Sequence, residues 1–363
     1  MEHIGIDLGS SKSAICIACE TGVLLLETTV RTLELESFLA KRPASRVVLE
    51  SCAESRRVAQ RALELGHEAR IIPTSFVRSL GIGSRNIKND KRDARNIVMA
   101  SIRLGDELPH VHIRSDEMVA IQDVVRARSS LVSQRTMAIN FVRAQLRKEL
   151  LGRGPRATPL TFSKQVRELV GDNHGVEIGA HLAIIDALNK QIAALDKRIK
   201  EMAKTSEPAA RLQKITGVGP IIALAFLAAV DDPKRFASGR HLASYVGLSP
   251  GENTTGGNIR RTSIIAAGQK QLRGLLVQSA HTMLNARKTR EPMAEWALEI
   301  ERRRGRKVAV CALARRLSVV MWAMLRDETR YDPTQTRSRI RPAPQASSPE
   351  TTFGDVFAST SVT

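Results

Sequence analysis

Four acidic residues in the first hundred positions have side chains and spacings that suit phosphoryl transfer. Asp7 ends the apolar run HIGI and Glu50 ends the run VVL, so both carboxylates project from the ends of expected strands. Asp90 and Asp93 lie three residues apart at the start of an expected helix, which places both on one helical face. Two Mg²⁺ ions about 4 Å apart need carboxylate ligands from several elements. We therefore predict that Asp7, Glu50, Asp90 and Asp93 are catalytic metal ligands.

Each of these acids also has a structural interpretation when it is taken alone. Asp90 and Asp93 could cap a helix or favour its N-terminus through the helix dipole. Asp7 is harder to explain in this way, because it lies between Ile6 and Leu8 and an unpaired buried carboxylate is costly. The metal-site interpretation therefore depends most on Asp7.

A second candidate stretch is GENTTGGNIRRTS, residues 251–263, in which Thr254 and Thr255 precede two glycines and two arginines. Glycines let a phosphate approach the backbone closely. A threonine hydroxyl can act as a nucleophile when a metal or a base activates it. The alternative is a turn in which the threonine side chains bond to their own backbone.

The elements around the acids predict an α/β domain over residues 1–160. Gly9 to Lys12 form a turn between two β-rich runs, which predicts a hairpin. A helix ending on Gly66 separates the next two strands, and longer helical patterns follow. The strands are expected at 3–9, 13–19, 45–51 and 69–75, and the longer helices at 90–103 and 115–150. Cys16 and Cys19 point to opposite faces of the second run, so we expect structural cysteines.

The second half of the chain is expected to be helical. Apolar residues from Ile178 to Met202 recur at steps of three and four, which predicts a coiled-coil connector over 161–207 or one amphipathic helix packed on its own chain. A mostly helical domain should cover 208–330. Gly217 and Gly219 separate two of its helices and resemble the turn of a helix-hairpin-helix unit, whose amides can hold a DNA phosphate. Residues 331–363, rich in Pro, Ser, Thr and Arg, predict a disordered tail.

The charge of the chain indicates a polyanionic partner. The 56 Lys and Arg residues exceed the 37 Asp and Glu residues, the formal charge is +19, and nucleic acid is the leading candidate. Aromatic residues make up 3% of the chain, so phosphate contacts should dominate over base stacking. Phosphate contacts are expected from a row of arginines in the helix at 115–150: Arg126, Arg128, Arg135, Arg143 and Arg147. Four cysteines, no signal peptide and no apolar run of about 20 residues favour a cytoplasmic protein without a membrane partner.

Several stretches resemble the DEDD insertion-sequence transposases of the IS one-ten type. They include GIDLGSSKSAI, VVLES and KNDKRDA around the acids, and ITGVGPIIALAFLAAVDDPKRFASGRHLASYVGLSPGE and VAVCALARRLSVVMWAMLRDETRYDP further on. The resemblance covers nearly all of residues 3–333. It implies an RNase H-like, RuvC-like first domain, in which Asp7, Glu50, Asp90 and Asp93 are the four family acids. A second, transposase-specific domain would follow.

The resemblance also implies an activity. It implies a homo-oligomeric, Mg²⁺-dependent DNA recombinase that works with a structured guide RNA, which pairs with donor and target DNA. Its nucleophile is a serine brought to the acids by the second domain, and Thr255 occupies that position here. Ile265 to Gly268 replace a polar and basic run of the family. The basic residues expected on nucleic acid are, besides the arginine row, Lys12, Arg260, Arg261, Lys270 and Arg273.

Two other functions compete with an active recombinase. One is a nucleic-acid binder that keeps the fold and charge but has lost recombination, because threonine stands in the serine position. The other is an actin-like phosphotransferase, which would need a second Gly-rich phosphate hairpin after DLGSSKS, and the sequence has none. A P-loop is excluded because no glycine precedes Lys12 at the required place.

Overall fold

The structure of the chain is a computed structural model that describes residues 1–79, 90–152, 154–171, 175–253, 261–265, 267–286 and 291–334. The side chains of residues 78, 79, 90, 91 and 261 lie outside this description. The chain divides into two compact units, Met1–Asp116 and Glu117–Thr363.

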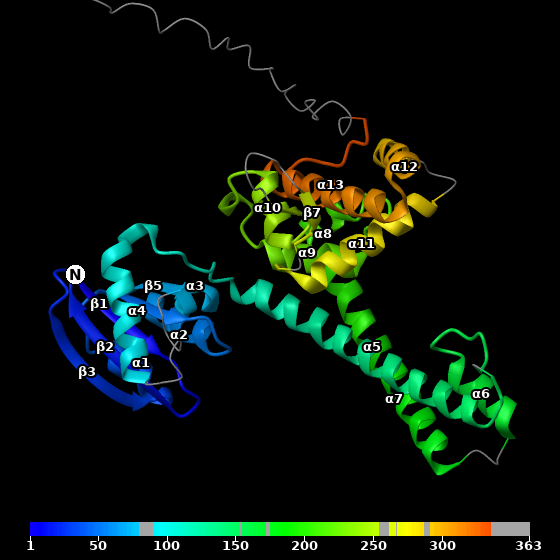
Figure 1. Cartoon of the computed structure of the whole chain (residues 1–363), viewed down its shortest axis with the longest axis horizontal. Helices are drawn as coiled ribbons and strands as arrows, with labels where there is room; N and C mark the ends of the chain where they lie inside the picture. Colours follow the sequence, from blue (N-terminus) through cyan, green and yellow to red (C-terminus); the bar gives the residue numbers. More distant parts are fainter. Residues whose placement is uncertain are drawn as a thin grey trace, which may run out of the picture. The chain divides into compact units, whose positions relative to one another are not determined.

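The first unit is built on a five-stranded sheet with the order β3-β2-β1-β4-β5 (Figure 1). The strands are β1 (Glu2–Asp7), β2 (Lys12–Cys19), β3 (Leu24–Arg31), β4 (Ser45–Glu50) and β5 (Glu68–Ile72). The first three strands pair antiparallel, whereas β1 with β4 and β4 with β5 pair parallel. The crossover therefore puts β1 in the centre of the sheet, with β4 beside it.

Helices cover both faces of this sheet. Ile4, Ile6, Val47 and Leu49 are buried in one cluster with residues of α1 (Leu35–Leu39) and α2 (Ser55–Glu64). Side chains alternate between the faces of a strand, so Gly5 and Val48 belong to the other face. There Val48 packs with Ile97 of α4 (Asp90–Leu104). The short α3 (Thr74–Ser79) follows β5.

Gly5 allows α4 to lie directly on β1. A Cβ at Gly5 would stand 2.5 Å from the carbonyl oxygen of Ala94 and 2.6 Å from Cγ2 of Val98. These distances are shorter than van der Waals contact, so only glycine fits without moving the helix. The contact of Gly5 with Ala94 and Val98 therefore sets how far Asp93, the residue before Ala94, lies from the sheet.

We expect Gly5→Ala to destabilise the first unit by about 2–3 kcal/mol, because the added methyl group overpacks the contact between β1 and α4. Denaturant unfolding of the full chain measures the change. Gly274→Ala is the control, since no atom lies within 4 Å of a Cβ at Gly274. In the interior of a helix this second change should stabilise by about 0.5–1 kcal/mol. Equal effects of the two substitutions would contradict the packing argument.

The buried Arg46, near the start of β4, connects that end of the sheet to the turn after α4. Nε of Arg46 donates to Oε2 of Glu68 at 2.7 Å, and its Nη2 donates to Oδ1 of Asp106 at 2.8 Å. Hydrogen bonds from Arg46 and Arg70 hold the pKa of Asp106 below its ordinary value. Both ends of α4 are thus anchored, one by packing on Gly5 and the other by this network.

The first unit confirms the expected hairpin, the two later strands and the helices between and after them. β3 was not predicted, although Leu24 to Leu26 and Val30 form an apolar run; in the structure it is an edge strand with no fully buried residue. Cys16 is buried, Cys19 is partly buried and both thiols are free, which agrees with structural cysteines.

The second unit begins with three helices that form an arm: α5 (Asp116–Lys148), α6 (Phe162–Val170) and α7 (Val176–Thr205) (Figure 1). Val142 and Leu146 of α5, Phe162 of α6, and Leu182 and Ile185 of α7 share one buried cluster. The apolar face of α7 is therefore buried against its own chain. This arrangement corresponds to the own-chain alternative to a coiled coil.

The rest of the second unit is mostly helical. It contains α8 (Glu207–Leu212), α9 (Pro220–Val230), α10 (Gly239–Val246), α11 (Lys270–Asn285), α12 (Pro292–Arg304) and α13 (Arg306–Arg326), and the small hairpin β6 (Pro250–Glu252) and β7 (Arg261–Ile264). Within the described residues, α13 is the helix whose length and hydropathy would suffice to cross a membrane. Leu313, Leu317 and Met321 are fully buried against the other helices, so it serves as a core helix. The tail expected at 331–363 lies outside the described residues from residue 335 onward.

Candidate active site and nucleic-acid contacts

Two of the four predicted acids end neighbouring parallel strands. Ile6 of β1 pairs with Leu49 of β4, so Asp7 and Glu50 follow each other in register at the carboxyl ends of the two strands. Both are partly buried. Asp7 lies two residues after Gly5, and Glu50 two residues after Val48, so both side chains belong to the face that α4 covers. The central sheet thus brings two carboxylates from distant positions to one edge.

The other two acids lie in the first turn of α4. Asp93 is 8% exposed and precedes Ala94, the residue that contacts Gly5. Asp90 is the first residue of α4, but its side chain lies outside the described residues. The structure therefore brings Asp7, Glu50 and Asp93 to one end of one sheet face. The position of the Asp90 carboxylate is not described.

The donor set of this site suits a hard divalent cation, because Mg²⁺ and Mn²⁺ prefer carboxylate oxygens. In the described part of the chain, no group of three or more His, Cys, Asp or Glu side chains is close enough together to hold a metal ion. Asp7, Glu50 and Asp93 thus form no metal cluster by themselves, and their role as ligands together with Asp90 stays a prediction.

Lys12 lies at the same end of the sheet as Asp7. Asp7 pairs with Ala14 in the β1–β2 hairpin, and Lys12 lies two residues before Ala14 on β2. Ala14 packs with Ala94 and Val98 of α4, so alternation also puts the exposed Lys12 on the α4 side. A cation at this edge is suitably placed to contact a phosphate near the acids.

Thr255 and Arg260 lie outside the described residues, as does the side chain of Arg261. The structure does describe the base of their loop. Pro250 pairs with Ile264 and Glu252 pairs with Arg261 in the antiparallel hairpin of β6 and β7. The hairpin therefore closes the segment that carries Thr254 and Thr255.

Arg273, predicted to bind nucleic acid, instead forms hydrogen bonds to the backbone on either side of this hairpin. Its Nη1 donates to the carbonyl oxygen of Ala267 at 2.8 Å and to that of Val246 at 3.3 Å. These two carbonyl groups lie before and after the hairpin in the chain. The described bonds give Arg273 a structural role at the base of the loop.

The arginine row of α5 divides into two groups. Nε of Arg128 donates to Oδ1 of Asp196 at 2.7 Å, and Nη1 of Arg135 donates to Oδ1 of Asn189 at 2.8 Å. These two arginines therefore hold α5 against α7. The remaining three members of the row, Arg126, Arg143 and Arg147, line pockets instead.

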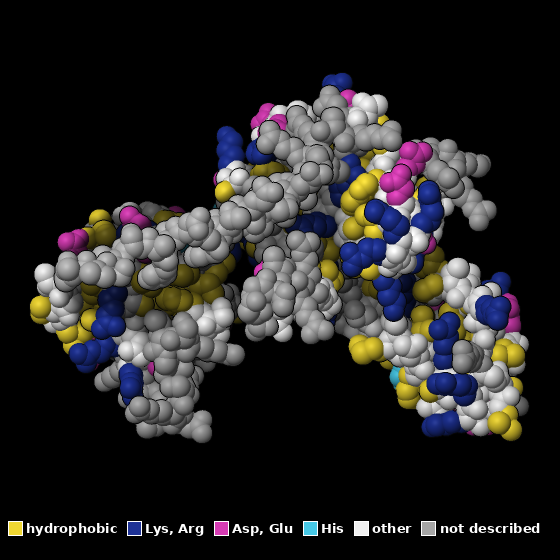
Figure 2. Space-filling view, turned by 45° about the horizontal axis from the view of Figure 1, so that its top comes forward, with side chains coloured by type: hydrophobic (Ala, Val, Ile, Leu, Met, Phe, Trp, Pro, Cys, Tyr) yellow, Lys and Arg dark blue, Asp and Glu magenta, His cyan; other side chains and the backbone are white. Residues whose placement is uncertain are grey.

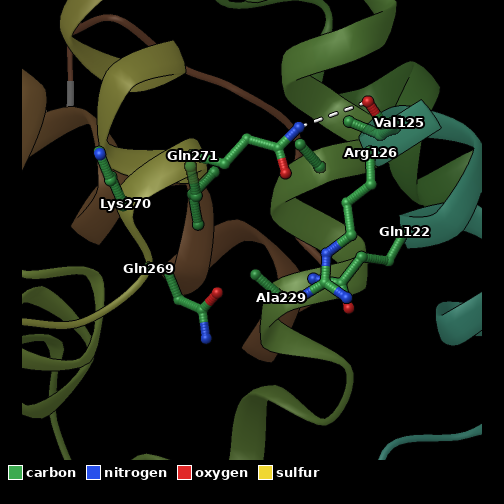
Figure 3. A pocket seen from close by; sticks show the side chains of 9 residues that line it. Gln122, Val125, Arg126, Ala229, Gln269, Lys270 and Gln271 are labelled. Carbon is green, nitrogen blue, oxygen red and sulfur yellow. Dashed lines mark hydrogen bonds between the residues drawn. The ribbon is translucent and has the colours of Figure 1, made fainter. Parts of the chain in front are cut away.

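Arg126 and Lys270 line one pocket of about 230 Å³ between α5, α9 and the start of α11 (Figure 3). The guanidinium group of Arg126 lies beside Gln122 and near Ala229, whereas the Lys270 side chain points away from it. Gln271 separates the two, and its Nε2 donates to the carbonyl oxygen of Val125 at 3.4 Å. Their charged ends therefore do not converge on one point.

The turn with Gly217 and Gly219 connects α8 to α9, as the helix-hairpin-helix interpretation expects. Gly217 has φ +84°, and a Cβ there would stand 2.8 Å from the carbonyl oxygen of Ser279 in α11. The neighbouring amide of Thr216 donates to Oε1 of Glu291 at 3.1 Å. Gly217 is thus required by packing, whereas a Cβ at Gly219 would meet no atom within 4 Å.

Arg156, which is not among the residues predicted from the sequence, lines a pocket with Arg143 and Arg147. Lys and Arg side chains are visible over this arm in Figure 2. The available signal was the basic, glycine-rich segment GRGPRA after the long helix. Sequence alone gave no reason to group it with residues of α5.

Comparisons with known proteins identify the family of the chain. Residues 4–150 match a family of transposases of the IS110 DEDD type, and residues 209–295 match the family described as Transposase IS116/IS110/IS902. The first match contains all four acids, and the second contains the loop with Thr255.

Three relatives match along most of the chain. A probable family 20 transposase of Pseudomonas aeruginosa is 28% identical over 353 residues, which are 92% of this chain and 99% of the relative. The transposase for insertion sequence element IS1328 of Yersinia enterocolitica is 29% identical, over 88% of this chain and 96% of the relative. The transposase for IS1111A of Coxiella burnetii is 26% identical, over 90% of each. The chain belongs to the IS110 family of insertion-sequence transposases.

Proposed function

We propose that this transposase is a Mg²⁺-dependent DNA recombinase that cleaves and exchanges the strands of its own insertion sequence. The observation that supports the proposal is that Asp7 and Glu50 end neighbouring paired strands and that Asp93 lies on the helix that packs on the same face of the sheet. The strand order β3-β2-β1-β4-β5 supports an RNase H-like, RuvC-like first domain. Domain limits at 1–160, 161–207 and 208–330 belong to the same proposal.

In this proposal Asp7, Glu50, Asp90 and Asp93 hold the metal. Bound Mg²⁺ would neutralise charge on the phosphate and lower the pKa of an attacking hydroxyl. Asp7 and Glu50 have fixed spacing because both belong to paired strands, and Asp93 is fixed by the contact of α4 with Gly5. Lys12 would contact a neighbouring phosphate at the same sheet edge.

Thr255 supplies the hydroxyl nucleophile in this proposal. Its oxygen attacks a DNA phosphorus, a phosphothreonine ester forms, and the 3′ or 5′ oxygen of the cleaved strand leaves with a proton. The hairpin of β6 and β7, braced by Arg273, supports the role by closing the loop at a fixed base. A homo-oligomer and a structured guide RNA held through shape and charge complete the proposal.

The test is a strand-exchange assay with the full chain, the element's DNA ends and its RNA. We expect exchange and a covalent protein–DNA product in Mg²⁺, and loss of both in chelator. Omission of the RNA should abolish exchange if it guides the reaction. Equal product formation with and without divalent metal would contradict the metal assignment. Binding of DNA without any cleavage in Mg²⁺ would favour the alternative of an inactive nucleic-acid binder.

A further inference from the structure

A pocket of about 570 Å³ lies at the far end of the arm, where α5 ends and the chain turns back. Asn140, Arg143 and Arg147 of α5 line one side, and residues 154–156 line the other. Among the described residues that line it, three are arginines and none is acidic. The pocket is therefore strongly positive.

Local packing positions the three arginines. Arg143 and Arg147 lie one helical turn apart, on one face of α5. The guanidinium carbon of Arg143 lies 5.4 Å from the ring centroid of the fully buried Phe162, which restrains it. Gly154 has φ +71°, and a Cβ there would stand 2.7 Å from Cδ1 of Leu146. The segment that carries Arg156 thus lies against the last turns of α5.

Fold stability does not account for this grouping. A cation in the last turn, such as Arg147, is favoured by the helix dipole, but two like charges four residues apart repel by a few tenths of a kcal/mol. Within the described part of the chain, none of the three arginines is in an ion pair. Elsewhere on the arm the pattern differs, because Arg128 pairs with Asp196 and Arg167 pairs with Asp186, each at 2.7 Å.

We propose that this pocket, formed by Arg143, Arg147, Arg156 and Asn140, binds the phosphodiester backbone of a nucleic acid. Planar guanidinium groups match phosphate oxygens in pairs, and the Asn140 amide adds a neutral donor. The pocket exceeds the size of a single small anion and can take a sugar-phosphate unit. The choice of nucleic acid as the partner rests on the proposed function, whereas the positive pocket itself does not.

The test compares Arg156→Gln and the double variant Arg147→Gln/Arg156→Gln with the control Arg167→Gln. The control removes the same charge from the same arm, but its partner Asp186 already balances that charge. Binding of the full chain to duplex DNA, single-stranded DNA and single-stranded RNA of one sequence is measured across a range of salt concentrations. The three probes identify which nucleic acid occupies the pocket.

For the nucleic acid that binds in the pocket, the magnitude of the slope of log affinity against log salt should decrease for each arginine removed. The decrease should be roughly 0.9 on a duplex, or roughly 0.7 on a single strand. Arg167→Gln should leave the slope unchanged. Unchanged slopes on all three probes, or an equal change with Arg167→Gln, would overturn the proposal. Melting curves identical to that of the wild type confirm that Arg156→Gln keeps the fold.

Failure of this proposal differs from failure of the proposed function. The binding measurement needs neither metal nor cleavage. If strand exchange is absent but the arginine substitutions still change the salt slope, the pocket proposal holds and the proposed function fails. If strand exchange is normal but the arginine substitutions leave the salt slope unchanged, only the pocket proposal fails.

Discussion

Replacing Asp7 by asparagine is expected to reduce strand cleavage by about 10³-fold or more. Asparagine keeps the size of the side chain but removes the charge that a divalent cation needs, and metal stabilisation of the transition state contributes several kcal/mol. Asp7 is central because β1 lies in the middle of the sheet and pairs with β4, which carries Glu50. The measurement is the rate of DNA cleavage at saturating Mg²⁺.

Glu27→Gln is the matched control for Asp7→Asn. Glu27 is an exposed acid of the same unit, on edge strand β3, so its loss changes the net charge equally without touching the site. The cleavage rate of this variant should stay within about twofold of wild type, because exposed substitutions away from a site have small effects. Equal losses in both variants would mean that Asp7 acts only through overall charge. A rise in the Mg²⁺ concentration needed by Asp7→Asn would support direct ligation.

Replacing Thr255 by alanine is expected to abolish the covalent protein–DNA product, a loss of about 10³-fold or more, because alanine has no hydroxyl to attack phosphorus. DNA binding should persist, since the charged residues and the acids are unchanged. The measurement is the covalent product on a denaturing gel, together with binding of the same DNA.

Two further variants separate the role of Thr255 from a structural one. Thr254→Ala removes the neighbouring hydroxyl from the same loop and should leave the product largely intact. Thr255→Ser should keep the reaction or accelerate it up to about 100-fold, because loss of the methyl group frees χ1 and the approach to phosphorus. Full activity of Thr255→Ala would show that the nucleophile lies elsewhere. Activity that appears only in Thr255→Ser would identify a weakened enzyme.

Asp7→Asn and Thr255→Ala together also test whether the acids and the threonine serve one reaction. If they do, the double variant Asp7→Asn/Thr255→Ala should lose little more activity than Thr255→Ala alone, because residues that act as a unit have non-additive effects. Additive losses would indicate two separate activities. The comparison needs only the cleavage assay with four proteins, including wild type.

Much of the first unit could be predicted from local patterns. The runs HIGI and VVL are short, apolar and rich in β-branched residues, and their burial on both faces makes them readable as strands. β3 was missed although it contains three successive leucines; it lies at the edge of the sheet, and all of its residues are partly or fully exposed. Helix α7 was readable as amphipathic, but its period alone could not tell whether its partner would be α5 or another chain.

The roles of basic residues could not be predicted individually. Arg128 and Arg135 look like Arg143 in the sequence, yet the first two contact acceptors on α7 and the third lines a positive pocket. Arg273 likewise turned out to bond to two carbonyl groups of its own chain. A side chain's partner depends on which helix packs beside it, and local sequence does not encode that choice.

The residue types and their spacing already specify the chemistry that is available to this transposase: carboxylates at the ends of two apolar runs, a pair of acids that begins a helix, a glycine-flanked threonine and a net charge of +19. Strand pairing and helix packing determine which of these groups share one face of the molecule. The parallel pairing of β1 with β4 puts Asp7 beside Glu50, Gly5 lets α4, which carries Asp93, pack on the same face of the sheet, and the fold-back after α5 gathers Arg156 with Arg143 and Arg147. The physical reason is that strand pairing and helix packing join residues far apart in the chain, and no local pattern specifies those contacts.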